Sequence, residues 1–192
     1  MSRIPTIDPA QATGKQKTLL EAVQKKLGRT PNLTRVLANA PSALEGYLQF
    51  SGALATGSLP AAVREQIALT VAEANLCEYC LAAHTAIGGM VGLDTAATQA
   101  ARSASASDPK VDAILKFARS VVVNRGKVTD QDLSKARAAG VGDGEIIETT
   151  AHVALNLLTN YVNHVADTVV DFPKVEASAA QACGTDACST HR

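Results

Sequence analysis

Aromatic side chains are scarce in this chain of 192 residues. Only 3% of the residues are aromatic, namely three Tyr and three Phe with no Trp, although 46% are apolar. The chain can therefore bury an ordinary core, but that core must be built from Ala, Val, Leu and Ile. Proteins that bind single-stranded nucleic acid stack the bases on exposed aromatic rings, so the scarcity argues against such a platform.

Net charge and long apolar runs are lacking as well. Eighteen basic side chains balance eighteen acidic ones, and the formal net charge is zero. No strong field attracts phosphate backbones or anionic lipid, so neither nucleic acid nor a membrane is expected as a partner. No apolar run approaches the roughly 18 residues of a membrane span, and the N-terminal residues lack the apolar segment of a secretion signal. We therefore expect one cytoplasmic domain.

Apolar residues recur at helical spacing nearly throughout the chain, and no run alternates apolar and polar residues. The sequence predicts an all-α fold, a single-domain helical bundle over residues 1–172, with Thr129 and Asp143 as N-caps. The periodicity ends near residue 169, and residues 173–192 are expected to form a flexible tail. The predicted helices are 15–27, 33–38, 43–54, 61–75, 77–91, 95–104, 110–124, 130–139 and 145–168.

The four cysteines form two close pairs, Cys77/Cys80 and Cys183/Cys188. They are too few and too clustered for a disulfide framework across the chain. In a reducing compartment, a Cys-x-x-Cys motif is typical of redox or metal chemistry. The second pair, with His191 nearby, lies in the predicted tail, where no rigid support is expected. We therefore assign it no function.

Cys77, Cys80 and His84 share one face of a helix if that helix begins at Cys77. A thiol near a helix N-terminus lies close to unpaired N–H groups and the positive end of the dipole, which stabilise a thiolate. An imidazole one turn away can take the thiol proton, and two thiols three residues apart can close a disulfide. The spacing thus favours a dithiol redox centre. The alternative is structural zinc, which would need two further ligands.

A carboxylate is a further candidate for this site. Glu65 lies twelve residues before Cys77 on the preceding predicted helix, and an antiparallel helix pair would bring it back over the cysteines. Glu73 lies one helical turn before Cys77 and competes for the same role as proton source or sink. The spacing does not choose between the two.

The pattern formed by Glu65, eleven residues, Cys77-x-x-Cys80, three residues and His84 resembles the active-site signature of the alkylhydroperoxidase D family. That family is part of the carboxymuconolactone decarboxylase-like superfamily, and the resemblance covers roughly residues 40–125. It implies an all-α fold, homo-oligomers such as trimers or hexamers, and thiol-dependent reduction of peroxides. No metal or organic cofactor is expected.

The resemblance also implies roles for individual residues. Cys80 would be the attacking thiol, Cys77 its resolving partner, and His84 and Glu65 members of a proton relay. The expected partners are a small-molecule hydroperoxide and an external dithiol or thiol reductant. One position departs from the family: its hydroperoxidases have His just before the second Cys, where this chain has Tyr79. An unperturbed Tyr, with a pKa of about 10, does not shuttle protons readily near neutral pH.

The sequence thus predicts a thiol-dependent peroxidase or dithiol oxidoreductase that acts on organic hydroperoxides. Two alternatives remain open. One is a redox-sensing or structural oligomeric module, in which a Cys77–Cys80 bond alters assembly. The other is a carboxymuconolactone decarboxylase-like enzyme, although that chemistry does not require a vicinal dithiol.

A polar stripe in the last predicted helix is independent of the signature. His152, Asn156, Asn160 and His164 follow one another at spacings of four in an otherwise apolar segment. Polar groups inside an apolar helix need partners. These residues could line the thiol cavity, bond across a subunit interface or face water, and a structural or interface role is the interpretation we favour.

Overall fold

A computed structural model describes residues 2–178, which fold into nine α-helices and contain no strand. The predicted all-α fold is confirmed, and every helix lies within two residues of its predicted ends. The helices are α1 (Gly14–Leu27), α2 (Asn32–Leu37), α3 (Pro41–Leu54), α4 (Ala61–Ala74), α5 (Glu78–Met90), α6 (Thr95–Arg102), α7 (Pro109–Val123), α8 (Asp130–Ala138) and α9 (Asp143–Ala166).

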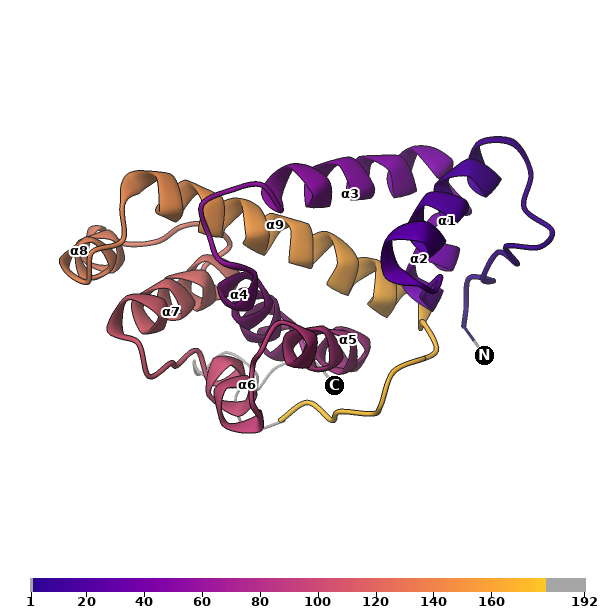
Figure 1. Ribbon diagram of the computed structural model, residues 1–192. Coiled ribbons are helices and arrows are strands. Elements are labelled where there is room, and N and C mark those ends of the chain that lie inside the picture. The colour runs from indigo at the N-terminus through magenta and orange to yellow at the C-terminus, as the bar shows by residue number, and fades with distance from the viewer. Residues whose placement is uncertain (1, 179–192) are drawn as a thin grey trace, which may run out of the picture.

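Helix α4 lies at the centre of the bundle. Helices α5, α6, α7 and α9 all pack against it (Figure 1). Its side chains from Gln66 to Glu73 are buried without interruption, so they do not form a single apolar stripe. A helix that is buried on every side is surrounded by other elements. Functional groups on α4 are therefore held by packing from several directions.

Helix α9 is the longest helix and crosses much of the molecule. Helix α3 runs alongside it, and α1 and α2 cover the end of the pair (Figure 1). Gly142 is the N-cap of α9, and its N–H donates a hydrogen bond to the carboxylate of Glu145 at 2.9 Å. The prediction that Asp143 caps this helix is wrong, because Asp143 is its first residue. The predicted cap at Thr129 is confirmed.

Residues 169–178, which we call the C-terminal strap, contain no helix and run from the end of α9 to α6 (Figure 1). A buried ion pair holds the end of the strap: the Nε of Arg102 donates to Glu73 Oε2 at 2.6 Å. Backbone groups of the strap bind both partners, since the N–H of Ser178 donates to Glu73 Oε1 and Arg102 Nη2 donates to the carbonyl of Glu176. The strap is therefore tied to α4 and α6.

The remainder of the predicted tail, which includes Cys183, Cys188 and His191, lies outside the described residues. Within residues 2–178, no helix has both the length and the apolar character needed to cross a membrane.

Candidate active site

The chain reverses direction between α4 and α5. Leu76 adopts a φ of 55°, in the left-handed region that an L-residue rarely enters, and the N–H of Cys77 then donates to the carbonyl of Ala72 at 2.9 Å. This turn folds α5 directly against α4 and places Cys77 at the N-cap of α5. The cysteine motif therefore begins a helix, as the sequence predicts.

Cys77 and Cys80 form a disulfide, with their Cα atoms 5.3 Å apart. Both residues are buried, and the N–H of Cys80 donates to the sulfur of Cys77 at 3.3 Å. Cys80 lies in the first turn of α5. Unpaired N–H groups and the positive end of the helix dipole there favour a negatively charged sulfur after reduction.

Two amides of α9 reach the sulfur of Cys80. The Nδ2 of Asn160 donates at 3.0 Å and the Nδ2 of Asn163 at 3.3 Å. A second contact fixes the Asn160 amide, because its Oδ1 accepts a hydrogen bond from Asn75 Nδ2 at 2.9 Å. With its oxygen occupied in this way, the amide presents its nitrogen to the sulfur. Spacing along the sequence did not identify either asparagine as a sulfur contact.

The polar stripe of α9 is thus divided among several environments. Asn160 contacts the sulfur, while His152 and Asn156 line the cavity beside it. Asn156 also donates to the carbonyl of His152 at 2.8 Å within the helix. His164 is exposed and bonds to the carbonyl of Asn75. Of the alternatives left open by the sequence, lining the thiol cavity describes His152 and Asn156, whereas Asn160 bonds to the sulfur itself.

His84 and Glu65 form a hydrogen-bonded pair. The Nδ1 of His84 lies 2.7 Å from Glu65 Oε2, and both side chains are mostly buried. An ionised carboxylate can only accept, so Nδ1 carries a proton and Nε2 is left to exchange one. In the described part of the chain, His84 bonds to neither sulfur. Glu73 is held by Arg102 instead, so Glu65 is the carboxylate that joins His84.

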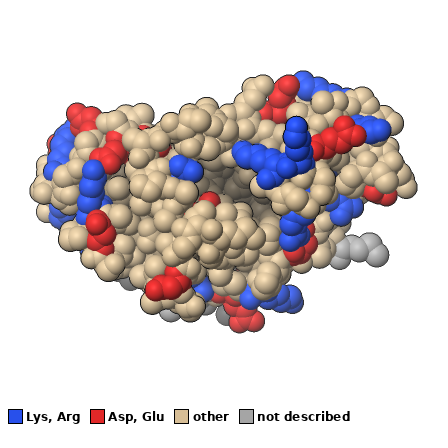
Figure 2. Space-filling model, viewed as in Figure 1, with Lys and Arg blue, Asp and Glu red and all other residues tan. Residues whose placement is uncertain are grey.

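A cavity of about 400 Å³ connects these groups, and Cys80, His84 and Glu65 line it. Cys77 does not, so Cys80 is the cysteine that faces the cavity. Figure 2 shows a hollow in the face of the molecule, with basic side chains on either side. Six different helices each contribute an apolar residue to the wall, and these residues are Val23, Leu33, Leu48, Ala68, Ile87 and Leu155.

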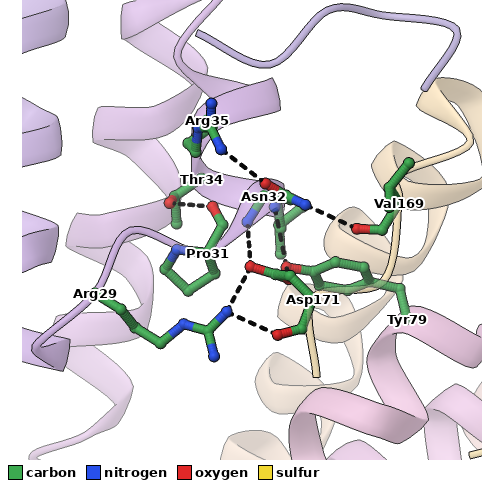
Figure 3. A network of polar contacts seen from close by, with 9 residues as sticks. Arg29, Pro31, Asn32, Thr34, Arg35, Tyr79, Val169 and Asp171 are labelled. Atoms are coloured by element: carbon green, nitrogen blue, oxygen red, sulfur yellow. Dashed lines mark hydrogen bonds and ion pairs between the residues drawn. The ribbon is translucent and has the colours of Figure 1, made fainter. Parts of the chain in front are cut away.

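Tyr79, which stands where the family has His, belongs to a polar network (Figure 3). Its hydroxyl donates to Asp171 Oδ1 at 2.8 Å and accepts from the N–H of Leu33 at 3.1 Å. The other oxygen of Asp171 binds Arg29 Nη2 at 2.6 Å. Burial raises the pKa of Tyr79, and the bond to Asp171 raises it further. The hydroxyl therefore anchors α5 to α2 and to the strap and does not exchange protons near neutral pH.

Phe172 of the strap completes this corner of the cavity. Its ring meets Tyr79 edge to face, with centroids 5.8 Å apart, and the guanidinium of Arg29 lies 4.5 Å from its centroid. Both contacts are favourable for an aromatic ring, through its quadrupole. The strap thus contributes a wall as well as a tether.

Within residues 2–178, no group of three or more His, Cys, Asp or Glu side chains has the arrangement of a metal site.

Comparison with known proteins shows which family and which solved structures this chain resembles. Residues 41–122 match the carboxymuconolactone decarboxylase family. A peroxidase-related protein from Ralstonia eutropha JMP134, described as an alkylhydroperoxidase AhpD core, superposes with a TM-score of 0.80. It is 26% identical, and the match covers 88% of this chain and 92% of that one. A search of curated proteins finds no match.

Two further structures share the fold. A peroxidase-related protein from Silicibacter sp. TM1040 has a TM-score of 0.75 at 22% identity, over 94% of this chain and 92% of that one. The debrominase Bmp8 has a TM-score of 0.75 at 17% identity, over 88% of this chain and 91% of that one. These comparisons confirm the resemblance to the alkylhydroperoxidase D-like and carboxymuconolactone decarboxylase-like family. Bmp8 shows that the fold also serves another activity.

Proposed function

We propose that the protein is a thiol-dependent peroxidase that reduces organic hydroperoxides through Cys77 and Cys80. The observation that carries this proposal is the placement of the Cys80 sulfur. It faces a largely apolar cavity, accepts hydrogen bonds from two amides, and lies within disulfide distance of Cys77. Amide donors stabilise a thiolate, which is the nucleophilic form of cysteine.

In the first step, His84 Nε2 takes the proton of the Cys80 thiol and passes it on, while Glu65 stabilises the charged imidazole. The thiolate then attacks the terminal oxygen of the peroxide, so that an S–O bond forms and the O–O bond breaks. The departing alkoxide receives the proton and leaves as an alcohol. Asn163 assists, because its Oδ1 is buried without a partner, lines the cavity and can accept the peroxide O–H.

In the second step, the Cys77 thiol attacks the sulfenic acid of Cys80. A disulfide forms and water leaves. An external dithiol then returns two electrons and two protons through a mixed disulfide and restores both thiols. All the electrons come from this dithiol, so the cycle requires no organic cofactor. We place the protein in the cytoplasm, where reductants of this kind are abundant.

The test of this function is peroxide consumption in the presence of dithiothreitol. The wild type should turn over, and Cys80→Ser should lose activity altogether. Cys77→Ser should react with one equivalent of peroxide and then turn over far more slowly, because the sulfenic acid lacks its resolving partner. Cys188→Ser is the matched control, since no role is assigned to that thiol. Equal rates for the wild type and Cys80→Ser would contradict the proposal.

We also propose that the protein is a homo-oligomer, a trimer or hexamer, joined through α9. Four large apolar side chains of that helix are exposed, by 70% for Ile147, 42% for Leu158, 58% for Tyr161 and 66% for Val165. The last three follow one another at spacings of three and four, as in a helix–helix seam. If redox sensing were the function, reduction of the Cys77–Cys80 bond would change the oligomer size without peroxide turnover.

A further inference from the structure

Two cations line the cavity without an acidic partner. Arg64 of α4 is half-buried and donates Nη1 to the carbonyl of Leu59 at 2.7 Å. Lys26 of α1 is exposed at the cavity. In the described part of the chain, neither forms a salt bridge. The one carboxylate among the lining residues, Glu65, is already bound to His84. The cavity therefore carries an excess of positive charge.

His152 lines the same cavity and is only 5% exposed, yet its Nε2 is buried without a hydrogen-bond partner. The closest carboxylate oxygen, Glu148 Oε1, is 4.0 Å away and already accepts from the N–H of Leu59. Burial lowers the pKa of His152, and the Arg64 charge lowers it further, while the charges of Glu148 and Glu65 oppose the shift. The imidazole is thus neutral at pH 7, and its Nε2 remains available to a ligand.

The side chain of His152 lies far from the sulfur of Cys80. His152 precedes Asn160 by eight residues on α9, which is about 12 Å along a helix. Asn160 contacts the sulfur of Cys80, so a hydroperoxide group alone cannot span the interval. Leu155 of the same helix lines the cavity between the two ends, and Ile87 and Leu48 line it from α5 and α3. The cavity has one reactive end, apolar walls and a second polar end.

We propose that the cavity binds an elongated organic hydroperoxide that carries a carboxylate at the end remote from the peroxide. The peroxide lies at Cys80, the apolar chain follows the walls, and Arg64 and His152 bind the carboxylate. A guanidinium that faces a cavity without an acidic partner, and that uses only Nη1 in the bond to Leu59, has donors left for the charge-assisted bonds that carboxylates favour. This inference rests on the proposed peroxidase function and adds the class of substrate to it.

The test compares a hydroperoxy fatty acid, with about 12 Å between peroxide and carboxylate, with its methyl ester. The wild type should prefer the acid by about tenfold or more in kcat/KM, since a hydrogen bond to a charged group has that effect. Arg64→Gln should bring the ratio of acid to ester close to one, and Arg64→Lys should retain part of it. Arg125→Gln, which removes an exposed charge outside the cavity lining, should keep the wild-type ratio.

His152 is tested in the same way. His152→Leu should lower the ratio of acid to ester, and His152→Gln, which keeps an N–H donor at similar reach, should restore much of it. A role confined to packing predicts that both variants lower the rates for acid and ester equally, which would overturn the assignment of His152.

A binding measurement separates failure of this inference from failure of the proposed function. Calorimetry with the oxidised protein uses the corresponding hydroxy acid and its methyl ester, which lack the peroxide. Tenfold tighter binding of the acid than of the ester, lost in Arg64→Gln, would support the carboxylate site. If that binding is found but neither hydroperoxide is consumed, the carboxylate site stands and the peroxidase function is wrong. Equal binding and equal consumption of acid and ester by the wild type would overturn the carboxylate site and leave the peroxidase function standing.

Discussion

At the scale of single residues, the environment of the Cys80 sulfur decides the chemistry. Helix α5 supplies its N-terminal dipole, and α9 supplies the side-chain amides of Asn160 and Asn163. The donors from α9 are side-chain amides, which bond to the sulfur without a change of protonation state. They do not replace a proton shuttle at position 79, so proton transfer at the proposed site depends on His84 and Glu65.

Replacing Asn160 by Ala tests this role of the amides. Loss of one hydrogen bond to a charged acceptor costs about 1.5–3 kcal/mol, so the thiolate population should fall about tenfold or more. Alkylation of Cys80 by iodoacetamide at pH 7 should slow by a similar factor. Asn156→Ala is the matched control, because Asn156 lies in the same stripe but bonds to its own helix. Unchanged alkylation of Asn160→Ala would contradict the role of the amide.

His152 gives the stability of the protein a predictable pH dependence. Burial holds its pKa below the ordinary value of 6.5, so the unfolded chain binds a proton at a higher pH than the folded chain does. The free energy of unfolding should therefore fall as the pH drops below about 6.5. Urea titrations between pH 7.5 and 5.5 should show a smaller fall for His152→Gln. An equal fall for the wild type and His152→Gln would mean that folding does not lower the pKa of His152, which would contradict this prediction.

At the scale of elements, helices were predictable because their signals are local. Pro41 at the first turn of α3 and the Thr129 cap of α8 are examples in which a few neighbouring residues determine a boundary. The reactive motif was predictable for the same reason, since Cys77, Cys80 and His84 lie within two turns of one helix. Their spacing fixes their relative placement wherever the helix packs.

Contacts between distant elements were not predictable in this way. Asn160 lies 80 residues from Cys80, and Asp171 lies 92 residues from Tyr79. Their pairing depends on how α9 and the strap pack against α5, which no local pattern specifies. The choice between Glu65 and Glu73 also required the packing, because Arg102 of α6 binds Glu73.

The buried pair of Glu73 and Arg102 should be a main support of α4, α6 and the strap. Glu73→Ala removes one partner and leaves a buried guanidinium, at a cost of about 3–5 kcal/mol. Urea unfolding should show this loss, and proteolysis near residue 176 should accelerate because Ser178 loses its acceptor. Glu21→Ala, which removes an exposed carboxylate of α1, should change stability by less than about 0.5 kcal/mol. Similar losses for the two variants would contradict a supporting role of the pair.

At the scale of the whole molecule, the exposed apolar face of α9 predicts assembly. Tyr161→Glu places a charge in the proposed seam and should shift the protein to smaller species in analytical ultracentrifugation. Gln131→Glu introduces the same charge on exposed α8 and should leave the sedimentation unchanged. A wild type that sediments as a monomer, or a Tyr161→Glu variant that assembles normally, would exclude α9 as the interface.

The central claim is that Cys80, the cysteine that faces the cavity, attacks the peroxide. The most direct measurement is dimedone labelling of the reduced Cys77→Ser and Cys80→Ser variants after brief exposure to cumene hydroperoxide, with the labelled residue located by mass spectrometry. The account predicts a sulfenic acid adduct at Cys80 in Cys77→Ser and none at Cys77 in Cys80→Ser. Labelling of Cys77 in Cys80→Ser, with Cys80 unlabelled in the other variant, would contradict it.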